Sequence, residues 1–217
     1  MNTIWNREAV LALYRQLPSG HCDLHTLRRV LRDGAKQGGD VVTLDDDYSY
    51  AAGIDFGRRY ASHTYQTLSG RSRATLAGTL YHDIDIVACH PTMLLHAFKT
   101  ATIESPELEA YITDREATIA DIIANHTTLD RATVKKGYNV ATYLGCYKKH
   151  ATGRRSHIQQ LERFTRELRS NAKLLAGRPE HADLLALAKR HKEDGKSHLG
   201  TFLSYVCQQL EARARSR

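Results

Sequence analysis

Apolar residues recur at helical spacing through most of the 217-residue chain, and this periodicity restricts the fold more than any other feature. After Pro91 the pattern is almost unbroken. Gly38 and Gly39 end the early helical pattern, and residues 40–60 are expected to be irregular or extended. The predicted helices span residues 5–17, 23–32, 91–101, 106–123, 131–143, 158–176, 181–192 and 199–214. These spans predict a predominantly helical α+β fold.

One short segment, TLYHDIDIV at residues 79–87, follows a different pattern. Its residues alternate with period 2 and include several β-branched side chains, which predicts a strand. Asp83 and Asp85 would then lie on the same face. Two carboxylates placed in this way can hold a hard divalent cation such as Mg²⁺ and leave coordination positions open for phosphate oxygens. The alternative to a metal site is that one aspartate is exposed to solvent and the other caps the following helix.

The charge balance indicates the class of partner. The chain has 31 Lys and Arg residues against 24 Asp and Glu, a formal net charge of +7 and a pI near 9.3. Such an excess favours nucleic acids, nucleotide phosphates or anionic membranes. No apolar run approaches the roughly 20 residues of a membrane span, and the N-terminus has no secretory pattern. We therefore expect an intracellular protein, cytoplasmic or nuclear, that is neither secreted nor bound to a membrane.

A second candidate element is the helix of DRATVKKGYNVATYLG, where Arg131, Lys135 and Tyr143 lie at i, i+4 and i+12. These steps keep the three side chains near one face of a helix. Arginine binds phosphate oxygens bidentately, and lysine presents a movable point charge. A tyrosine two turns further on could meet the sugar and base of the same nucleotide. The alternative is an ordinary surface helix with exposed cations and half-buried tyrosines.

The order of these two elements resembles family A DNA polymerases and the single-subunit phage-type RNA polymerases. The strand reads DxDIVxxHP, like palm motif A, and the helix reads R-x₃-K-x₇-Y, like fingers motif B, although Gly145 comes one residue late. The segment around Gly57 and Tyr60, followed by DIDIVACHPTMLL, is similar to a divergent viral and mobile-element branch. The resemblance implies a partial polymerase palm with helical fingers over residues 57–217, preceded by an N-terminal helical region at 1–56.

The resemblance also implies roles for single residues. Asp85 would be the first catalytic carboxylate and a Mg²⁺ ligand, with Asp83 as a helper ligand. Lys135 would act catalytically on the pyrophosphate leaving group. The substrate-binding set would be completed by Arg131 at the outer phosphate, Tyr143 beside the incoming nucleotide, and His90 near the 2′ side of the sugar.

Nucleic acid would be held elsewhere on the chain. The basic segment KKHATGRR is a candidate for template or primer backbone, with a solvated interhelix loop as an equal alternative. Its four cations are Lys148, Lys149, Arg154 and Arg155. Gln208 corresponds to a glutamine that the resemblance places near the template.

One part of the family pattern is missing. These polymerases carry a second carboxylate in a His-Asp hairpin, motif C, and no such segment follows Tyr143. The sequence is then a fragment, an inactive relative, or a chain whose second carboxylate comes from a downstream segment or a partner. The expected function is template-directed DNA synthesis in DNA replication, a nucleotidyltransferase reaction with Mg²⁺, nucleoside triphosphate, template and primer. The alternatives are a non-catalytic basic nucleic-acid-binding protein on a degenerate polymerase scaffold and a helical protein-interaction module.

Overall fold

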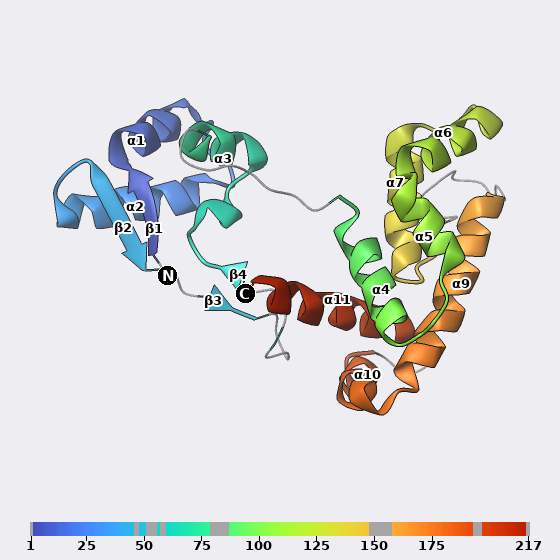
Figure 1. Ribbon diagram of the computed structural model, residues 1–217. Coiled ribbons are helices and arrows are strands. Elements are labelled where there is room, and N and C mark those ends of the chain that lie inside the picture. The colour runs from blue at the N-terminus through green and yellow to red at the C-terminus, as the bar shows by residue number, and fades with distance from the viewer. Residues whose placement is uncertain are drawn as a thin grey trace. The chain divides into compact units, whose positions relative to one another are not determined.

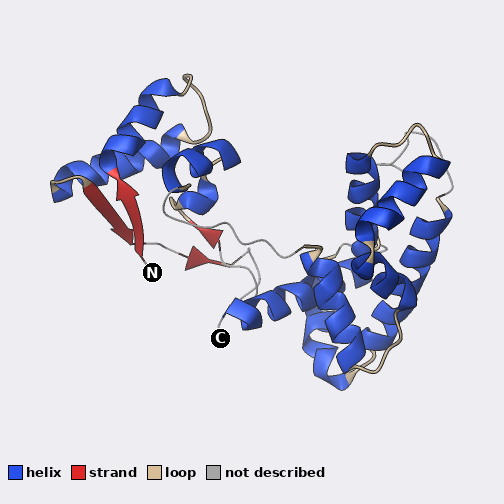
Figure 2. Cartoon of the chain, turned by 45° about the horizontal axis from the view of Figure 1, so that its top comes forward, coloured by secondary structure: helices blue, strands red, loops and turns tan. Residues whose placement is uncertain are grey.

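The computed structural model describes residues 2–45, 48–50, 56, 60–78, 87–147, 158–192 and 197–215. These belong to two compact units, Met1–Asp85 and Ile86–Arg217 (Figure 1). Figure 2 shows that helices dominate both and that the strands are short. This confirms the predominantly helical α+β class. The division at residue 57, which separates regions by function, stays a prediction.

The first unit combines helices with two small antiparallel sheets, β1 with β2 and β3 with β4. Its elements are β1 (Asn2–Asn6), α1 (Arg7–Gln16), α2 (Leu24–Gln37), β2 (Val41–Asp45), β3 (Tyr48–Ser49), β4 (Tyr60–Ala61), the 3₁₀ helix η1 (Tyr65–Thr67) and α3 (Gly70–Ala77). The first helix begins at Arg7, two residues later than predicted, because residues 2–6 form a strand that pairs with β2. Asn6 then caps α1, since its side chain accepts a hydrogen bond from the Ala9 amide at 2.8 Å.

The core of the first unit forms on one face of the β1–β2 sheet. Trp5 lies opposite Val42 in the register, and both are fully buried. The Trp5 ring packs on Tyr65 with 4.1 Å between centroids. Helix α2 approaches the strand so closely that a Cβ on Gly34 would stand 2.3 Å from a Val42 methyl carbon. The sequence pattern did not predict this sheet, because its two strands are short and two helices separate them in the chain.

The second unit is helical throughout the residues that the structure describes. Its elements are α4 (Cys89–Thr100), α5 (Pro106–Thr113), α6 (Arg115–Asn125), α7 (Arg131–Thr142), α9 (Gln159–Ala176), the 3₁₀ helix η2 (Pro179–His181), α10 (Ala182–Arg190) and α11 (Leu199–Arg215). Helix α11 packs against α4, α9 and α10. Three aromatic rings join α5, α7 and α9: Tyr111 stacks on Tyr138 at 4.0 Å, and Phe164 meets both edge-on.

The single helix predicted over 106–123 is wrong, because the structure contains two helices that meet at Asp114. Asp114 leaves the helical region at φ −135° and its carboxylate accepts a hydrogen bond from the Ala117 amide at 3.3 Å. The Thr118 hydroxyl donates to the Asp114 carbonyl at 2.8 Å. Aspartate competes for nearby backbone amides, and here that local capping ends one helix and begins the next.

Helix α9 supplies the cap that α5 lacks. Ser105 occupies the N-cap position with Pro106 after it, but its side chain makes no capping hydrogen bond. Instead, Glu167 of α9 accepts hydrogen bonds from the amides of Glu107 and Leu108 at 2.8 and 2.9 Å. A carboxylate from another helix thus satisfies the free amides at the start of α5.

Two further expectations concern the strand predicted over 79–87 and the lack of a membrane span. Residues 79–86 of the predicted strand, including Asp83 and Asp85, lie outside the described residues; Val87 lies in a turn and is 72% exposed. Across the part of the chain that is described, no helix is both long enough and apolar enough to cross a bilayer.

Candidate functional site

The N-terminus of α4 presents His90 in the first turn. Ala88 adopts a left-handed backbone, φ 49°, immediately before the helix. This turn sets the direction in which α4 begins, one residue before Cys89 and two before His90. His90 is half-buried and is held by its surroundings on both its ring and its backbone.

The C-terminus of α7 presents Tyr143. This residue caps the helix, and Leu144 after it has a left-handed φ of 58°. The amides of Leu144 and Gly145 return to the carbonyls of Ala141 and Val140 at 2.8 and 3.0 Å. The helix therefore ends in a tight, hydrogen-bonded turn that fixes the Tyr143 backbone.

His90 and Tyr143 meet although 53 residues separate them in the sequence. The Tyr143 hydroxyl and the His90 Nδ1 atom are hydrogen-bonded, with donor and acceptor set by the histidine tautomer. Their rings lie edge to face, with 5.6 Å between centroids and 71° between planes. The structure therefore brings together two residues that the sequence placed in different motifs.

Helix α11 supports both members of this pair. A Cβ on Gly200 would lie 2.1 Å from the Tyr143 carbonyl oxygen, so only glycine allows α11 to approach the α7 turn this closely. Seven residues on, the buried Cys207 thiol lies 3.7 Å from the His90 carbonyl oxygen, and burial raises the pKa of that thiol. Neither contact has a local sequence signal, because each joins segments far apart in the chain.

The other end of α7 is exposed and charged. Arg131, the first helical residue, forms a two-point ion pair with Glu116 of α6: Nε to Oε2 at 3.0 Å and Nη2 to Oε1 at 2.8 Å. Their side chains are 57% and 62% exposed. The hydrogen bond from Arg131 lowers the pKa of Glu116, and Lys135 adds to that effect through its charge. The guanidinium that was predicted to bind a phosphate thus already holds a carboxylate.

Helix geometry gives the spacing of the three motif B residues. At 1.5 Å rise per residue, Lys135 lies about 12 Å and Arg131 about 18 Å along the axis from Tyr143, all within an arc of about 120°. Lys135 is exposed. The span from Tyr143 to Lys135 therefore suits a nucleoside triphosphate laid along the helix, with Arg131 at its far end.

The other predicted site residues divide into two groups. Gln208 is half-buried on α11, and its amide donates to the Ser204 hydroxyl on the preceding turn at 3.2 Å. The predicted metal ligands Asp83 and Asp85 and the basic segment with Lys148, Lys149, Arg154 and Arg155 lie outside the described residues.

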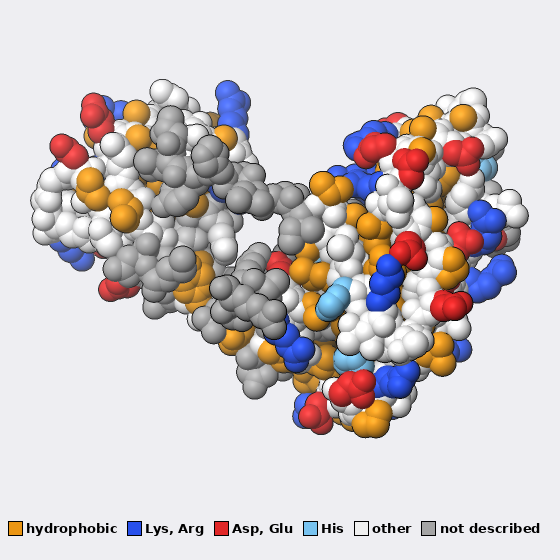
Figure 3. Space-filling view, viewed as in Figure 1, with side chains coloured by type: hydrophobic (Ala, Val, Ile, Leu, Met, Phe, Trp, Pro, Cys, Tyr) orange, Lys and Arg blue, Asp and Glu red, His pale blue; other side chains and the backbone are white. Residues whose placement is uncertain are grey.

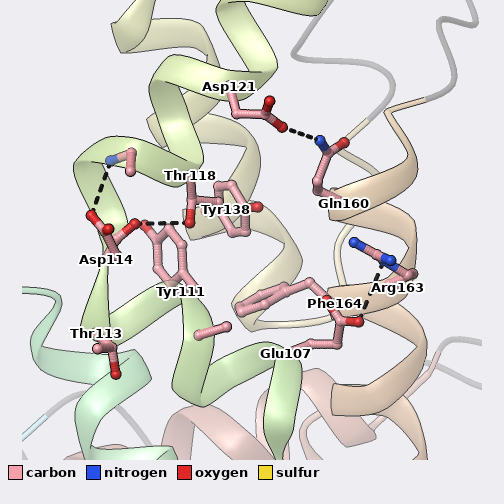
Figure 4. A pocket seen from close by; sticks show the side chains of 12 residues that line it. Glu107, Tyr111, Thr113, Asp114, Thr118, Asp121, Tyr138, Gln160, Arg163 and Phe164 are labelled. Atoms are coloured by element: carbon pink, nitrogen blue, oxygen red, sulfur yellow. Dashed lines mark hydrogen bonds and ion pairs between the residues drawn. The ribbon is translucent and has the colours of Figure 1, made fainter.

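A separate pocket of about 460 Å³ lies where α5 and α6 meet α7 and α9 (Figure 4). Tyr111, Tyr138 and Phe164 form its aromatic lining, and burial raises the pKa of both tyrosines. Figure 4 shows that several polar side chains around it are already paired. Asp121 accepts from Gln160 at 2.7 Å, and Glu107 pairs with Arg163 at 3.4 Å. Three acidic residues against one arginine line this pocket, so it does not suit a polyphosphate.

In the first unit, His21, Cys22 and Asp23 place ligand atoms within 4.8 Å of one another. Asp23 is fully buried and already committed: it accepts hydrogen bonds from the Ser69 amide at 2.9 Å and the Ser69 hydroxyl at 2.7 Å. Burial acts to raise its pKa, but these bonds outweigh that effect and lower the pKa to about 2. Asp23 thus joins α2 to α3, and the mixed nitrogen, sulfur and oxygen set does not resemble a Mg²⁺ site.

Comparison with known proteins gives one partial match to report. The chain is 28% identical over 161 residues to the "Putative helicase V13" of Sputnik virophage, across 72% of this chain and 20% of that protein. The chain thus spans about a fifth of the length of this relative. No family model and no solved structure matches the chain.

Proposed function

We propose that this chain is the nucleotide-binding part of a template-directed nucleotidyltransferase of the DNA polymerase type. Its substrates would be a deoxynucleoside triphosphate and a primed template, with Mg²⁺ as the metal. The proposal starts from the resemblance to motifs A and B and is supported by one observation in particular.

That observation is the contact between His90 and Tyr143. The resemblance assigns His90 to the 2′ side of the sugar and Tyr143 to the same nucleotide, so the two must be neighbours if the motifs are read correctly. They are hydrogen-bonded through the ends of two different helices. This contact supports the assignment of both residues to one nucleotide-binding site.

Lys135 is the second supporting feature. It projects from α7 at about the length of a nucleotide from Tyr143. Phosphoryl transfer depends mainly on positioning and charge neutralisation, so a lysine at this distance would act on the β- and γ-phosphates. Arg131 would join it only after releasing Glu116, which makes Glu116 a competitor for the arginine.

Asp85, with Asp83 as helper, would hold Mg²⁺ beside these phosphates. Bound there, Mg²⁺ would neutralise charge on the transferring phosphoryl group. A second carboxylate would come from a downstream segment or a partner. The name of the virophage relative, a putative helicase, supports the broader class of nucleic-acid-handling proteins and does not by itself favour a polymerase.

The test compares Asp85→Asn with Asp83→Asn, a matched pair two residues apart. Primer extension is measured with the segment or partner that carries the second carboxylate, and Mg²⁺-dependent binding of deoxynucleoside triphosphate is measured on the chain itself by calorimetry. Removing a charge-stabilising group at a reacting centre costs several kcal/mol, so Asp85→Asn should slow extension by about 10²-fold or more. Asp83→Asn should have a much smaller effect.

Equal extension by the wild type and Asp85→Asn would overturn the assignment of the catalytic carboxylate. Full extension by these 217 residues alone would show that the second carboxylate lies within the chain after all. If Asp85→Asn and Lys135→Gln both bind triphosphate as well as the wild type does, the polymerase proposal as a whole is overturned.

A second candidate is a non-catalytic nucleic-acid-binding module on the same scaffold. The Arg131–Glu116 pair favours it, because a guanidinium held by a carboxylate at two points is not poised for a phosphate. This candidate predicts nucleic-acid binding that is unchanged by triphosphate and Mg²⁺.

A further inference from the structure

Helix α9 carries a row of exposed cations, Arg166, Arg169 and Lys173, which we call the α9 stripe. At 100° per residue the three positions fall within an arc of about 60°, and at 1.5 Å per residue they span about 10.5 Å. The stripe therefore forms a straight, positively charged edge on one helix of the second unit.

Helix α9 has two acidic residues: Glu167 lies off the line of the stripe, whereas Glu162 lies on it, one turn before Arg166. Glu167 is directed to the first amides of α5, as described above. The other, Glu162, interacts with the hydroxyl of the buried Tyr147, an interaction that, after burial itself, raises the pKa of that tyrosine. Both carboxylates thus make contacts within the fold, and among the described residues neither forms an ion pair with the stripe.

Many other cations are paired. Arg29, Arg32 and Lys36 surround Asp33, and Lys99 pairs with Glu109. On the face drawn in Figure 3, Lys and Arg side chains of the second unit lie among Asp and Glu. Within the described ranges, by contrast, the side chains of the three stripe residues take part in no hydrogen bond or ion pair. The three positive charges are therefore exposed to solvent.

We propose that the α9 stripe binds the phosphate backbone of a nucleic-acid strand. Along a duplex axis the phosphates of one strand recur about every 3.4 Å, so the stripe is about as long as three such intervals. Arginine and lysine on flexible stems would contact phosphates without reading bases, which gives sequence-independent binding. The proposal rests on the proposed function, for which it would supply a contact to template or primer strand separate from residues 148–155.

The experiment removes three charges at two different places. One variant carries Arg166→Gln, Arg169→Gln and Lys173→Gln; the control carries Lys189→Gln, Arg190→Gln and Lys192→Gln, which are exposed cations in and just after α10. Each lowers the formal net charge from +7 to +4, that is 7 − 3. Binding of a labelled single-stranded oligodeoxythymidylate is followed by fluorescence anisotropy across a series of salt concentrations, with circular dichroism as the folding check.

Counterion release makes the slope of log K against log salt about −0.7 for each phosphate neutralised on a single strand. Loss of three contacts should therefore flatten the slope by about 2 in the stripe variant, and by much less in the control. An equal change in both variants would overturn the proposal, because net charge alone would explain it. An unchanged slope in the stripe variant would also overturn it. Retained triphosphate binding and primer extension in that variant would leave the proposed function intact, whereas a wild-type chain that binds no oligonucleotide would count against both.

Discussion

The two ends of helix α7 are built in different ways. At the C-terminal end, Tyr143 is fixed by a tight turn, by His90 of α4 and by the close approach of Gly200 of α11. At the N-terminal end, Arg131 and Lys135 are exposed, and the partner of Arg131 among the described residues is the exposed Glu116. One end is determined by packing and the other by charge.

Under the proposed function, this difference would divide two tasks between the two ends of the helix. A packed tyrosine–histidine pair can act as a fixed surface for the sugar and base, since neighbouring helices hold its geometry. Exposed cations on flexible stems can follow phosphates and release them, since surface ion pairs are weak and screened by salt. If the proposed function is right, changes at the packed end should alter stability, and changes at the charged end should alter binding.

The largest effect is expected from Gly200→Ala. The added Cβ would meet the Tyr143 carbonyl oxygen at 2.1 Å and its carbon at 3.1 Å. Because these are backbone atoms, α11 must move, and overpacking of this kind costs about 1–3 kcal/mol. Denaturant unfolding should therefore shift to a lower midpoint.

Gly177→Ala is the matched control for this change. Gly177 lies in the same unit at φ −77°, and the nearest atoms to its added Cβ are at 3.5 Å, an ordinary contact. Its midpoint should change little. Equal shifts in the two variants would show that α11 does not hold the packed end in place.

The next effect is expected from Lys135→Gln. Loss of a charged contact to phosphate should weaken deoxynucleoside triphosphate binding by about tenfold, which corresponds to about 1.4 kcal/mol. Lys136→Gln changes the adjacent exposed lysine and serves as the control. Calorimetry should separate the two variants in affinity, while their unfolding midpoints stay alike. An equal loss of triphosphate affinity in both variants would contradict the specific role of Lys135.

A smaller effect is expected from Tyr143→Phe, which removes the hydroxyl that meets His90. One hydrogen bond contributes about 0.5–1.5 kcal/mol to stability. Tyr205→Phe removes the hydroxyl of a second tyrosine–histidine pair, in which the Tyr205 oxygen lies 2.6 Å from His191 Nδ1. Both variants should lose similar stability, but only Tyr143→Phe should change the ratio of deoxyribonucleotide to ribonucleotide binding. An unchanged ratio would remove the sugar-facing role from the packed end.

The smallest effect on stability is expected from Glu116→Gln, because its ion pair with Arg131 is exposed. Affinity for triphosphate should rise by a few fold, since the variant frees the guanidinium. Arg131 lowers the pKa of Glu116, so the stabilisation from this pair is present above its ordinary pKa of 4.5 and is lost as pH falls below it. Melting temperatures measured from pH 7 to 3 should therefore decline less in the variant. A decline equal to that of the wild type would show that the pair contributes nothing.

Much of the fold could be predicted because its signals are local. Helical spacing predicted α7 and α9 almost to their ends, with Gly177 closing α9. Pro106 indicated the start of α5, because proline suits the first turn of a helix. The failure over 106–123 was also local: the apolar pattern continues past Asp114, and the prediction took no account of capping by this residue.

The sequence by itself thus determined most of the helical segments, although not α3 or the break at Asp114, and which residues belong to the two candidate motifs. Only the tertiary structure decided that His90 meets Tyr143, that Gly200 permits this, and that Glu116 occupies Arg131. Periodicity and capping act over a few residues, so they can be read along the chain. Contacts between residues 53 or 60 positions apart depend on how whole helices pack, and no local pattern encodes that packing.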